Sequence, residues 1–268
     1  MKISLQYGVL LAGIVCCAPL QSAELSGYAG LGVAVSPVYS GSQHSAPGPL
    51  LNAGVSLRSE SWGLWGLSTE GLAWTLPSDS PFTVSLLLTP DKGRKEVFSY
   101  PFSTRKNRDL QGMGDLPDML MAGAELRYQH GDWALWLRAL SATQKHPYGG
   151  ETQALAMTLN SGVKTTLWRW RDADLSVAGD ISWANSSYQQ RHYGVTTSQA
   201  QRTDFASYYP SSGFQQGGVY TELVWHISEN LAAGVTGRAA YLLDEAGKSP
   251  LVKSRMQYSL SSLIQYTF

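Results

Sequence analysis

The strongest constraint on the fold is a two-residue alternation at the end of the chain, in residues 256–268. One set of alternate positions is largely apolar with aromatic ends, and the other set is nearly all polar. The first set is Met256, Tyr258, Leu260, Ser262, Ile264, Tyr266 and Phe268. A period of two places successive side chains on opposite faces, which predicts a β-strand and not a helix. Transmembrane β-barrel strands have this make-up, with apolar residues outward and aromatic residues at the interface.

The pattern recurs along the chain in eleven segments separated by turns or polar loops. They are residues 24–36, 50–58, 62–74, 82–88, 118–128, 133–140, 155–163, 175–183, 220–227, 231–243 and 256–268. A single-chain bacterial barrel needs an even number of strands, so we assign residues 96–102 as the twelfth. The prediction is an all-β fold, a single antiparallel transmembrane β-barrel of 12 strands. Ten strands are the alternative, if two early segments form one bent strand.

The positions of charged and aromatic residues favour a barrel over a soluble β-domain. Charges within the segments fall mostly on the polar phase: Glu125, Arg127, Arg138, Lys164, Asp180, Glu222 and Arg238. A charge that faces lipid near the midplane costs about 2–4 kcal/mol, whereas a charge in the lumen can be solvated or paired. Trp62, Trp133, Trp168 and Trp170 lie next to turns, as an interfacial girdle requires. Tight turns at residues 131–132, 171–174 and 228–230 are expected in the periplasm, with the longer polar loops outside.

The first 23 residues are expected to be a cleaved secretory signal peptide. Lys2 gives a positive start, residues 7–20 are nearly all apolar, and a small residue, Ala23, offers a cleavage point. Both cysteines, Cys16 and Cys17, lie in this segment, and a lipoprotein built on Cys16 is the weaker alternative because bulky residues precede it. The mature barrel would then span residues 24–268 and contain no thiol.

The net charge excludes one class of function. Twenty Lys and Arg balance twenty Asp and Glu in the 268 residues, so no basic excess exists to neutralise phosphates, and nucleic-acid binding is not expected.

Several loop signatures together resemble one family of outer-membrane proteins. They are residues 30–32 and 37–41, Arg108-Asp109, residues 112–115 before 121–124, residues 193–196, and residues 242–244 with 248–252. In order and spacing the chain resembles the MltA-interacting protein (MipA/OmpV) family. The resemblance implies a bacterial outer-membrane barrel. It also implies a scaffold that links a membrane-bound lytic transglycosylase to a murein synthase, and no catalytic residues come with it.

Chemistry on the loops is the least favoured function. The candidate catalytic residues of a hydrolase would be His44, His146 and His192, loop serines, and Asp109, Asp115 or Asp204. The chain has no Gly-x-Ser-x-Gly elbow and no metal-binding histidine spacing. Asp109 with Asp115 could bind a divalent cation, but a solvated loop is the simpler interpretation. Tyr193 and Tyr208-Tyr209 could form a ligand-binding surface, or they could pack the loop against the barrel. We therefore predict no catalytic, cofactor-binding or metal residues, and no cofactor; the ligand-binding residues are left unassigned.

The lumen charges allow a further alternative. Six of them, Glu125, Arg127, Arg138, Asp180, Glu222 and Arg238, could line a narrow channel or pair with one another and close it. Their near-balanced signs favour pairing, and the interior of a twelve-stranded barrel is small. We rank a scaffold first, a narrow channel or adhesin-like surface protein second, and an enzyme last. The expected partners are outer-membrane lipid, lipopolysaccharide, a lytic transglycosylase and a murein synthase.

Overall fold

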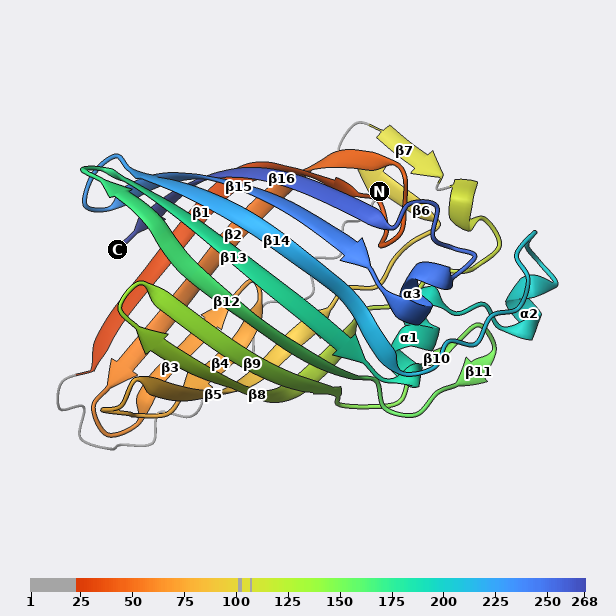
Figure 1. Ribbon diagram of the computed structural model, residues 1–268, viewed down its shortest axis with the longest axis horizontal. Helices are drawn as coiled ribbons and strands as arrows, with labels where there is room; N and C mark the ends of the chain where they lie inside the picture. The colour runs from red at the N-terminus through yellow and green to blue at the C-terminus, as the bar shows by residue number, and fades with distance from the viewer. Residues whose placement is uncertain (1–22, 101–102, 107) are drawn as a thin grey trace, which may run out of the picture.

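The computed structural model describes residues 23–100, 103–106 and 108–268, in which twelve antiparallel strands form a closed barrel (Figure 1). The predicted 12-stranded fold is confirmed, and the ten-stranded alternative is wrong. The barrel strands are β1 (Glu24–Pro37), β2 (Ser45–Ser59), β3 (Gly63–Ser68), β4 (Gly71–Thr75), β5 (Phe82–Asp91), β8 (Met119–His130), β9 (Trp133–Ala142), β12 (Met157–Trp170), β13 (Ala173–Ala184), β14 (Gly213–His226), β15 (Leu231–Leu242) and β16 (Met256–Thr267). The signal-peptide prediction falls on residues 1–23, of which 1–22, with both cysteines, lie outside the described residues.

The first and last strands close the barrel. β1 pairs with β16 in an antiparallel register that runs from Tyr28 opposite Thr267 to Val35 opposite Leu260. Beyond the ladder, Phe268 and Gly27 exchange two backbone hydrogen bonds of 2.8 and 2.9 Å. The alternation in residues 256–268 thus reflects a strand with lipid on one face and lumen on the other.

The twelfth strand comes from a different place than the sequence predicted. Residues 62–74 are not one strand but the hairpin β3–β4, which turns at Thr69 and Glu70. The assignment of residues 96–102 to the barrel is also wrong. β6 (Val97–Tyr100) pairs with β7 (Ser103–Lys106) in a separate two-stranded sheet, and residues 101 and 102 lie outside the described residues.

The two ends of the barrel differ sharply (Figure 1). The predicted tight turns at residues 131–132, 171–174 and 228–230 all lie at the end that holds the C-terminus. The opposite end carries the longer loops with η1 (Arg108–Leu110), β10 (Pro147–Tyr148), β11 (Glu151–Thr152), α1 (Ser186–Tyr193), α2 (Thr197–Ala200) and α3 (Asp244–Lys248). Gly131 adopts a φ of +56°, which glycine tolerates in a tight turn.

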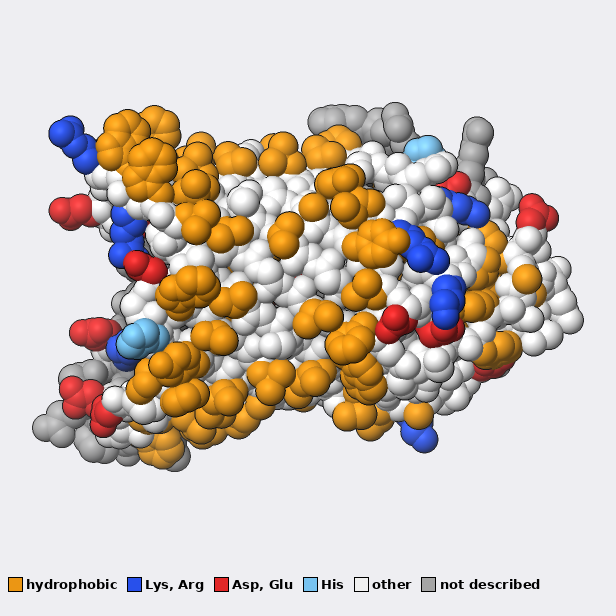
Figure 2. Space-filling model, viewed as in Figure 1, with side chains coloured by type: hydrophobic (Ala, Val, Ile, Leu, Met, Phe, Trp, Pro, Cys, Tyr) orange, Lys and Arg blue, Asp and Glu red, His pale blue; other side chains and the backbone are white. Residues whose placement is uncertain are grey.

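The outer wall is apolar. Exposed large hydrophobic residues occupy alternate positions of the strands, for example Leu260 and Ile264 in β16 and Leu31 and Val33 in β1. In Figure 2 these side chains cross the middle of the visible face, while charged side chains gather toward its two ends. None of the helices in the described part of the chain is long and apolar enough to cross a membrane.

Trp side chains gather at the end with tight turns. Trp62, Trp133, Trp168, Trp170 and Trp225 are all more than half exposed there. This placement confirms the predicted aromatic girdle on that side, because indole rings favour the boundary between lipid and water.

Candidate functional site

The lumen is the first candidate site, and the seven charges predicted there are paired. Glu125 of β8 lies opposite Arg138 of β9, and an Nη of Arg138 is 2.6 Å from Glu125 Oε2. Arg127, two residues along the same face, donates to Glu125 Oε1 at 3.1 Å. Glu125 is 6% exposed, so two guanidinium groups compensate one nearly buried carboxylate.

A second group of polar side chains comes from β9, β12, β13 and β15 and extends over β14, which lies between the last two. Arg238 of β15 donates to Asp180 Oδ2 of β13 at 3.1 Å, and it reaches over Gly218 of β14, where an added Cβ would lie 3.0 Å from the guanidinium. Asn160 donates to Asp180 at 3.2 Å and accepts a 2.7 Å hydrogen bond from Trp136 Nε1.

Lys164 forms an ion pair with Glu222. All seven lumen charges predicted from the sequence therefore have partners of opposite sign. The predicted mutual pairing is confirmed, and these seven charges form no single-sign ring of the kind that selects ions.

Between these groups the lumen holds a cavity of about 590 Å³. Its lining includes Glu70, a residue that sequence reasoning missed because residues 62–74 were taken as one strand. The sequence does contain a signal for the turn within residues 62–74. Trp65 and Leu67 occupy odd positions and Leu72 and Trp74 even ones, and this change of phase is what a two-residue turn produces.

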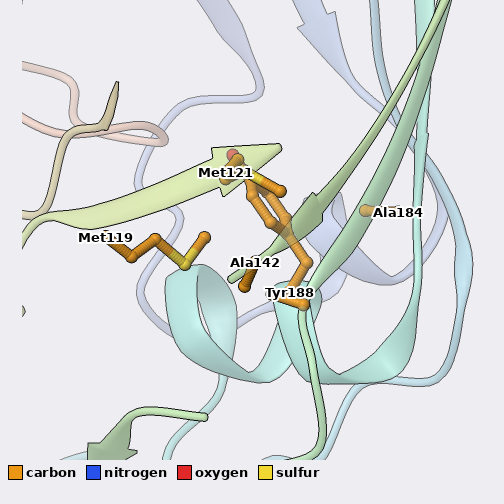
Figure 3. Packing of buried hydrophobic residues seen from close by; sticks show 6 residues of the cluster. Met119, Met121, Ala142, Ala184 and Tyr188 are labelled. Atoms are coloured by element: carbon orange, nitrogen blue, oxygen red, sulfur yellow. The ribbon is translucent and has the colours of Figure 1, made fainter. Parts of the chain in front are cut away.

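A folded cap closes the loop end of the barrel. Three clusters of buried side chains form its core: Met119, Met121, Ala142, Ala156, Ala184 and Tyr188; Tyr39, Leu110, Met113, Val195 and Leu251; Tyr193, Leu242 and Ala246. Figure 3 shows Tyr188 of α1 packed toward Met121, Ala142 and Ala184 of the barrel strands. Loops that pack a core of their own are ordered closures, because burial of apolar surface holds them together.

Polar contacts fix α1 to the wall. The side chain of Asp91, at the end of β5, lies 3.0 Å from His192 Nε2 and accepts a 3.0 Å hydrogen bond from the Tyr188 hydroxyl. Burial, and next the negative charge of Asp91, raise the pKa of Tyr188 well above its usual value. The hydroxyl therefore stays protonated and remains a hydrogen-bond donor. Arg94 donates to the Tyr148 hydroxyl at 3.1 Å on the same side of the cap.

The other residues considered for catalysis do not assemble. His44 lies in the β1–β2 loop and contacts Gln43, whereas His146 is in the β9–β10 connection with a buried Nε2. His192 pairs with Asp91, and among the described residues no hydroxyl donates to or accepts from its ring. The described part of the chain therefore places no nucleophile beside a base, and Asp204 has no hydrogen-bonded histidine there either.

The carboxylates considered for a cation do not form a cluster. Asp115 accepts a hydrogen bond from the Glu96 amide at 2.9 Å, and Asp109 has a buried oxygen, Oδ2, with no partner among the described residues. Within residues 23–100, 103–106 and 108–268 no group of three His, Cys, Asp or Glu side chains could hold a metal ion.

The loop tyrosines pack the cap down. Tyr193 is fully buried, its hydroxyl lies 2.7 Å from Ser40 Oγ, and Gln215 donates to it at 3.0 Å. Tyr208 donates to Glu245 at 2.9 Å, which joins the β13–β14 loop to α3. For Tyr193 and Tyr208 the geometry supports the packing role, whereas Tyr209 is 53% exposed and its hydroxyl donates to Glu151 at 2.8 Å.

With the twelve-stranded barrel, its lumen and its cap described, comparison with known proteins gives the family. The model of the family described as MltA-interacting protein MipA matches residues 29–268. The chain belongs to the MipA family. Together with the apolar wall, this places the barrel in the bacterial outer membrane, as predicted. By the orientation of such barrels, the tight turns of this MipA-family member face the periplasm and the capped loops face outward.

Solved structures similar to this MipA-family barrel are outer-membrane proteins at low identity. The translocator domain of the autotransporter NalP from Neisseria meningitidis is 9% identical, with a TM-score of 0.48, and the match covers 93% of this chain and 90% of that one. Salmonella typhi OmpF in complex with daunomycin is 11% identical, with a TM-score of 0.42 and coverage of 92% and 97%. The NanC porin is 9% identical, with a TM-score of 0.42 and coverage of 91% and 99%. No curated protein sequence matches the chain.

The periplasmic rim of the barrel carries a surface concavity. A surface concavity of about 630 Å³ lies between the β12–β13 turn and the β14–β15 turn, lined by Asp172, Trp225, His226, Ile227, Ser228 and Glu229. Beside it, Arg169 Nη2 is 2.8 Å from Asp132 and His226 Nε2 is 3.3 Å from Asp174. The rim thus offers an acidic edge next to apolar side chains.

Proposed function

We propose that this MipA-family barrel is a scaffold of the cell envelope that holds a lytic transglycosylase, and through it a murein synthase, at the inner face of the outer membrane. The observation that carries the proposal is the state of the barrel axis: the seven predicted lumen charges pair with one another, and a cap with its own core lies at the outer mouth. In a barrel built in this way, the residues that recognise a partner lie on the outer surface. Membership of the family of MltA-interacting proteins supports the same conclusion.

The periplasmic concavity is the surface that fits a partner. Individual periplasmic turns are short, but the hairpins β12–β13 and β14–β15 are joined side by side through β13 and β14, so their turns form one continuous face. Asp172 and Glu229 give this face negative charge, while Trp225 and Ile227 supply exposed apolar surface. Aromatic residues beside a charged edge are typical of protein interfaces.

A pull-down from gently solubilised envelopes, at native expression, tests the scaffold. The wild-type barrel should recover a murein hydrolase, and the variant Asp172→Lys/Glu229→Lys should lower the recovery at least tenfold. The matched control is Glu60→Lys/Asp79→Lys, a double reversal at exposed positions of the β2–β3 and β4–β5 turns on the same rim. Empty wild-type eluates would refute the scaffold, and equal loss in both variants would refute the choice of face.

Planar bilayers separate the scaffold from the channel. The purified barrel should give no steady conductance, because a cap with its own core lies at the outer mouth and the seven predicted lumen charges pair with one another. Reproducible conductance steps from the wild-type protein would favour the narrow channel instead.

A further inference from the structure

The barrel wall is incomplete on one side, because the β3–β4 hairpin is short. β2 pairs with β1 over residues 45–58, but with β3 only from Gly54 onward, where Ser68 lies opposite. One further hydrogen bond joins Thr69 to Ala53. Within the described part of the chain, residues 45–52 of β2 therefore have no strand partner on their second edge.

The other side of the gap is formed by β5 and the segment that follows it. β5 pairs with β4 only over residues 85–88. Above that point residues 92–95 continue next to residues 115–118, and Arg94 and Leu116 exchange two backbone hydrogen bonds of 3.0 and 2.7 Å. The gap thus has β2 as one side, this two-stranded extension as the other, and the Thr69–Glu70 turn as its lower boundary.

The gap lies at the depth of the outer leaflet. Ser68 is opposite Gly54, five positions from the periplasmic end of β2 at Ser59. Five residues at about 3.3 Å each, tilted by about 40°, rise roughly 13 Å, which is about half of the apolar band of roughly 25 Å. The wall therefore opens from near the membrane centre toward the outside.

A cavity of about 860 Å³ occupies this gap and passes around the free edge of β2. Ala46 and Gly48 line it from the lumen phase, and Pro47 and Pro49 line it from the lipid phase. A Cβ added to Gly48 would meet nothing within 4 Å. Because proline has no amide hydrogen to donate, Pro47 and Pro49 make this edge a poor site for an added strand. The occupant is therefore not a peptide strand.

The lining of the cavity combines apolar and basic groups. Apolar surface comes from Ala34, Pro37, Val38, Ala46, Pro47, Pro49, Leu116 and Pro117. Lys92 and Lys95 are exposed at the rim and have no ion-pair partner among the described residues. Two acids are also present, but Asp118 accepts from the Gly93 amide at 2.8 Å and Asp115 from the Glu96 amide at 2.9 Å. With Arg94, three cations face two hydrogen-bonded carboxylates.

We propose that this lateral opening binds a phosphorylated lipid of the outer leaflet. An acyl chain lies between Pro47 and Pro49 on one side and Leu116 and Pro117 on the other, and a headgroup phosphate contacts Lys92 and Lys95. Because the opening lies at the depth of the outer leaflet, an acyl chain can enter it from the lipid. The ammonium groups of Lys92 and Lys95 are complementary in charge to the headgroup phosphate.

Native mass spectrometry of the full-length, detergent-purified barrel with bisphosphorylated lipid A tests the site. Gly48→Trp fills the cavity and should lower the bound fraction at least tenfold. The matched control is Gly66→Trp, on the lumen phase of β3 below the gap, where a Cβ also meets nothing within 4 Å. Lys92→Ala/Lys95→Ala should weaken binding about fivefold to tenfold, whereas Lys145→Ala/Lys253→Ala, at exposed loop lysines elsewhere, should not.

Two further arms identify the ligand chemistry. Dephosphorylated lipid A should bind at least fivefold more weakly than the bisphosphorylated form, and millimolar inorganic phosphate should not displace the lipid. Equal binding to Gly48→Trp and wild type, or displacement by free phosphate, would overturn the proposal. Heat-modifiable migration on a detergent gel confirms that each variant is folded, and Gly48→Met replaces Gly48→Trp if the latter fails this check.

Discussion

Truncation of Glu125 to alanine is the sharpest test of the paired lumen. This carboxylate is 6% exposed and receives Arg138 and Arg127 at 2.6 and 3.1 Å. Its removal leaves two guanidinium groups in the lumen without their counter-charge. A hydrogen bond to a charged group contributes about 1.5–3 kcal/mol, and breaking a buried pair costs about 3–5 kcal/mol.

Solvent screening reduces this cost. The arginine side chains remain 49% and 40% exposed, so water in the lumen stabilises part of the charge that is left behind. We expect Glu125→Ala to lower the free energy of unfolding by about 2 kcal/mol, or roughly 30-fold in the equilibrium constant. Reversible urea unfolding in lipid vesicles, followed by tryptophan fluorescence, measures this loss.

A double-mutant cycle identifies the cause. Glu125→Ala/Arg138→Ala should lose clearly less than the sum of the two single variants, because the second change removes an unpaired charge. Glu70→Ala, an exposed lumen residue with no ion-pair partner in the described part of the chain, is the control and should shift stability by less than about 0.5 kcal/mol. If Glu125→Ala matches Glu70→Ala, or the cycle is additive, the lumen pairs do not stabilise the barrel.

Three further changes probe the seam, the lipid face and the cap. Gly32→Ala should block folding, because its Cβ would lie 1.9 Å from the Ser262 carbonyl oxygen. Loss of heat-modifiable migration measures this effect, and Gly48→Ala is the control that should fold normally. Normal folding of both variants would contradict the β1–β16 register. Leu260→Arg places a charge on the lipid face and should cost about 2–4 kcal/mol in vesicle unfolding, and an unchanged midpoint would show that this face does not meet lipid. Hydrogen bonds from Lys248 and next from Tyr208 lower the pKa of Glu245, so its stabilisation of the cap is present above about pH 4.5, its ordinary value, and is lost as the pH falls below it. Protection factors of the cap amides, which correct for the intrinsic pH dependence of exchange, should fall at that acidic pH in wild type and change less in Glu245→Gln. Identical pH profiles of the protection factors in the two proteins would exclude this interaction as a stabiliser of the cap.

The sequence determined the barrel, its membrane and the orientation of its side chains. A strand with lipid on one face and lumen on the other must alternate residue by residue, so residues 256–268 and the seven mid-strand charges could be assigned without coordinates. Tight turns with nearby tryptophans also fixed which end faces the periplasm.

The tertiary structure decided what local periodicity does not encode. The hairpin at Thr69 and Glu70 changes the phase of the alternation within the thirteen residues 62–74. A count of apolar positions in that segment does not reveal this change. The shortness of this hairpin leaves the gap that Lys92 and Lys95 border. Those lysines line the same cavity as Pro47 and Pro49 only because distant strands curve around one axis. The cap likewise joins Tyr39, Met113 and Leu251 from three separate loops. Such contacts depend on barrel closure, a property of the whole chain, and so no single stretch of sequence could specify them.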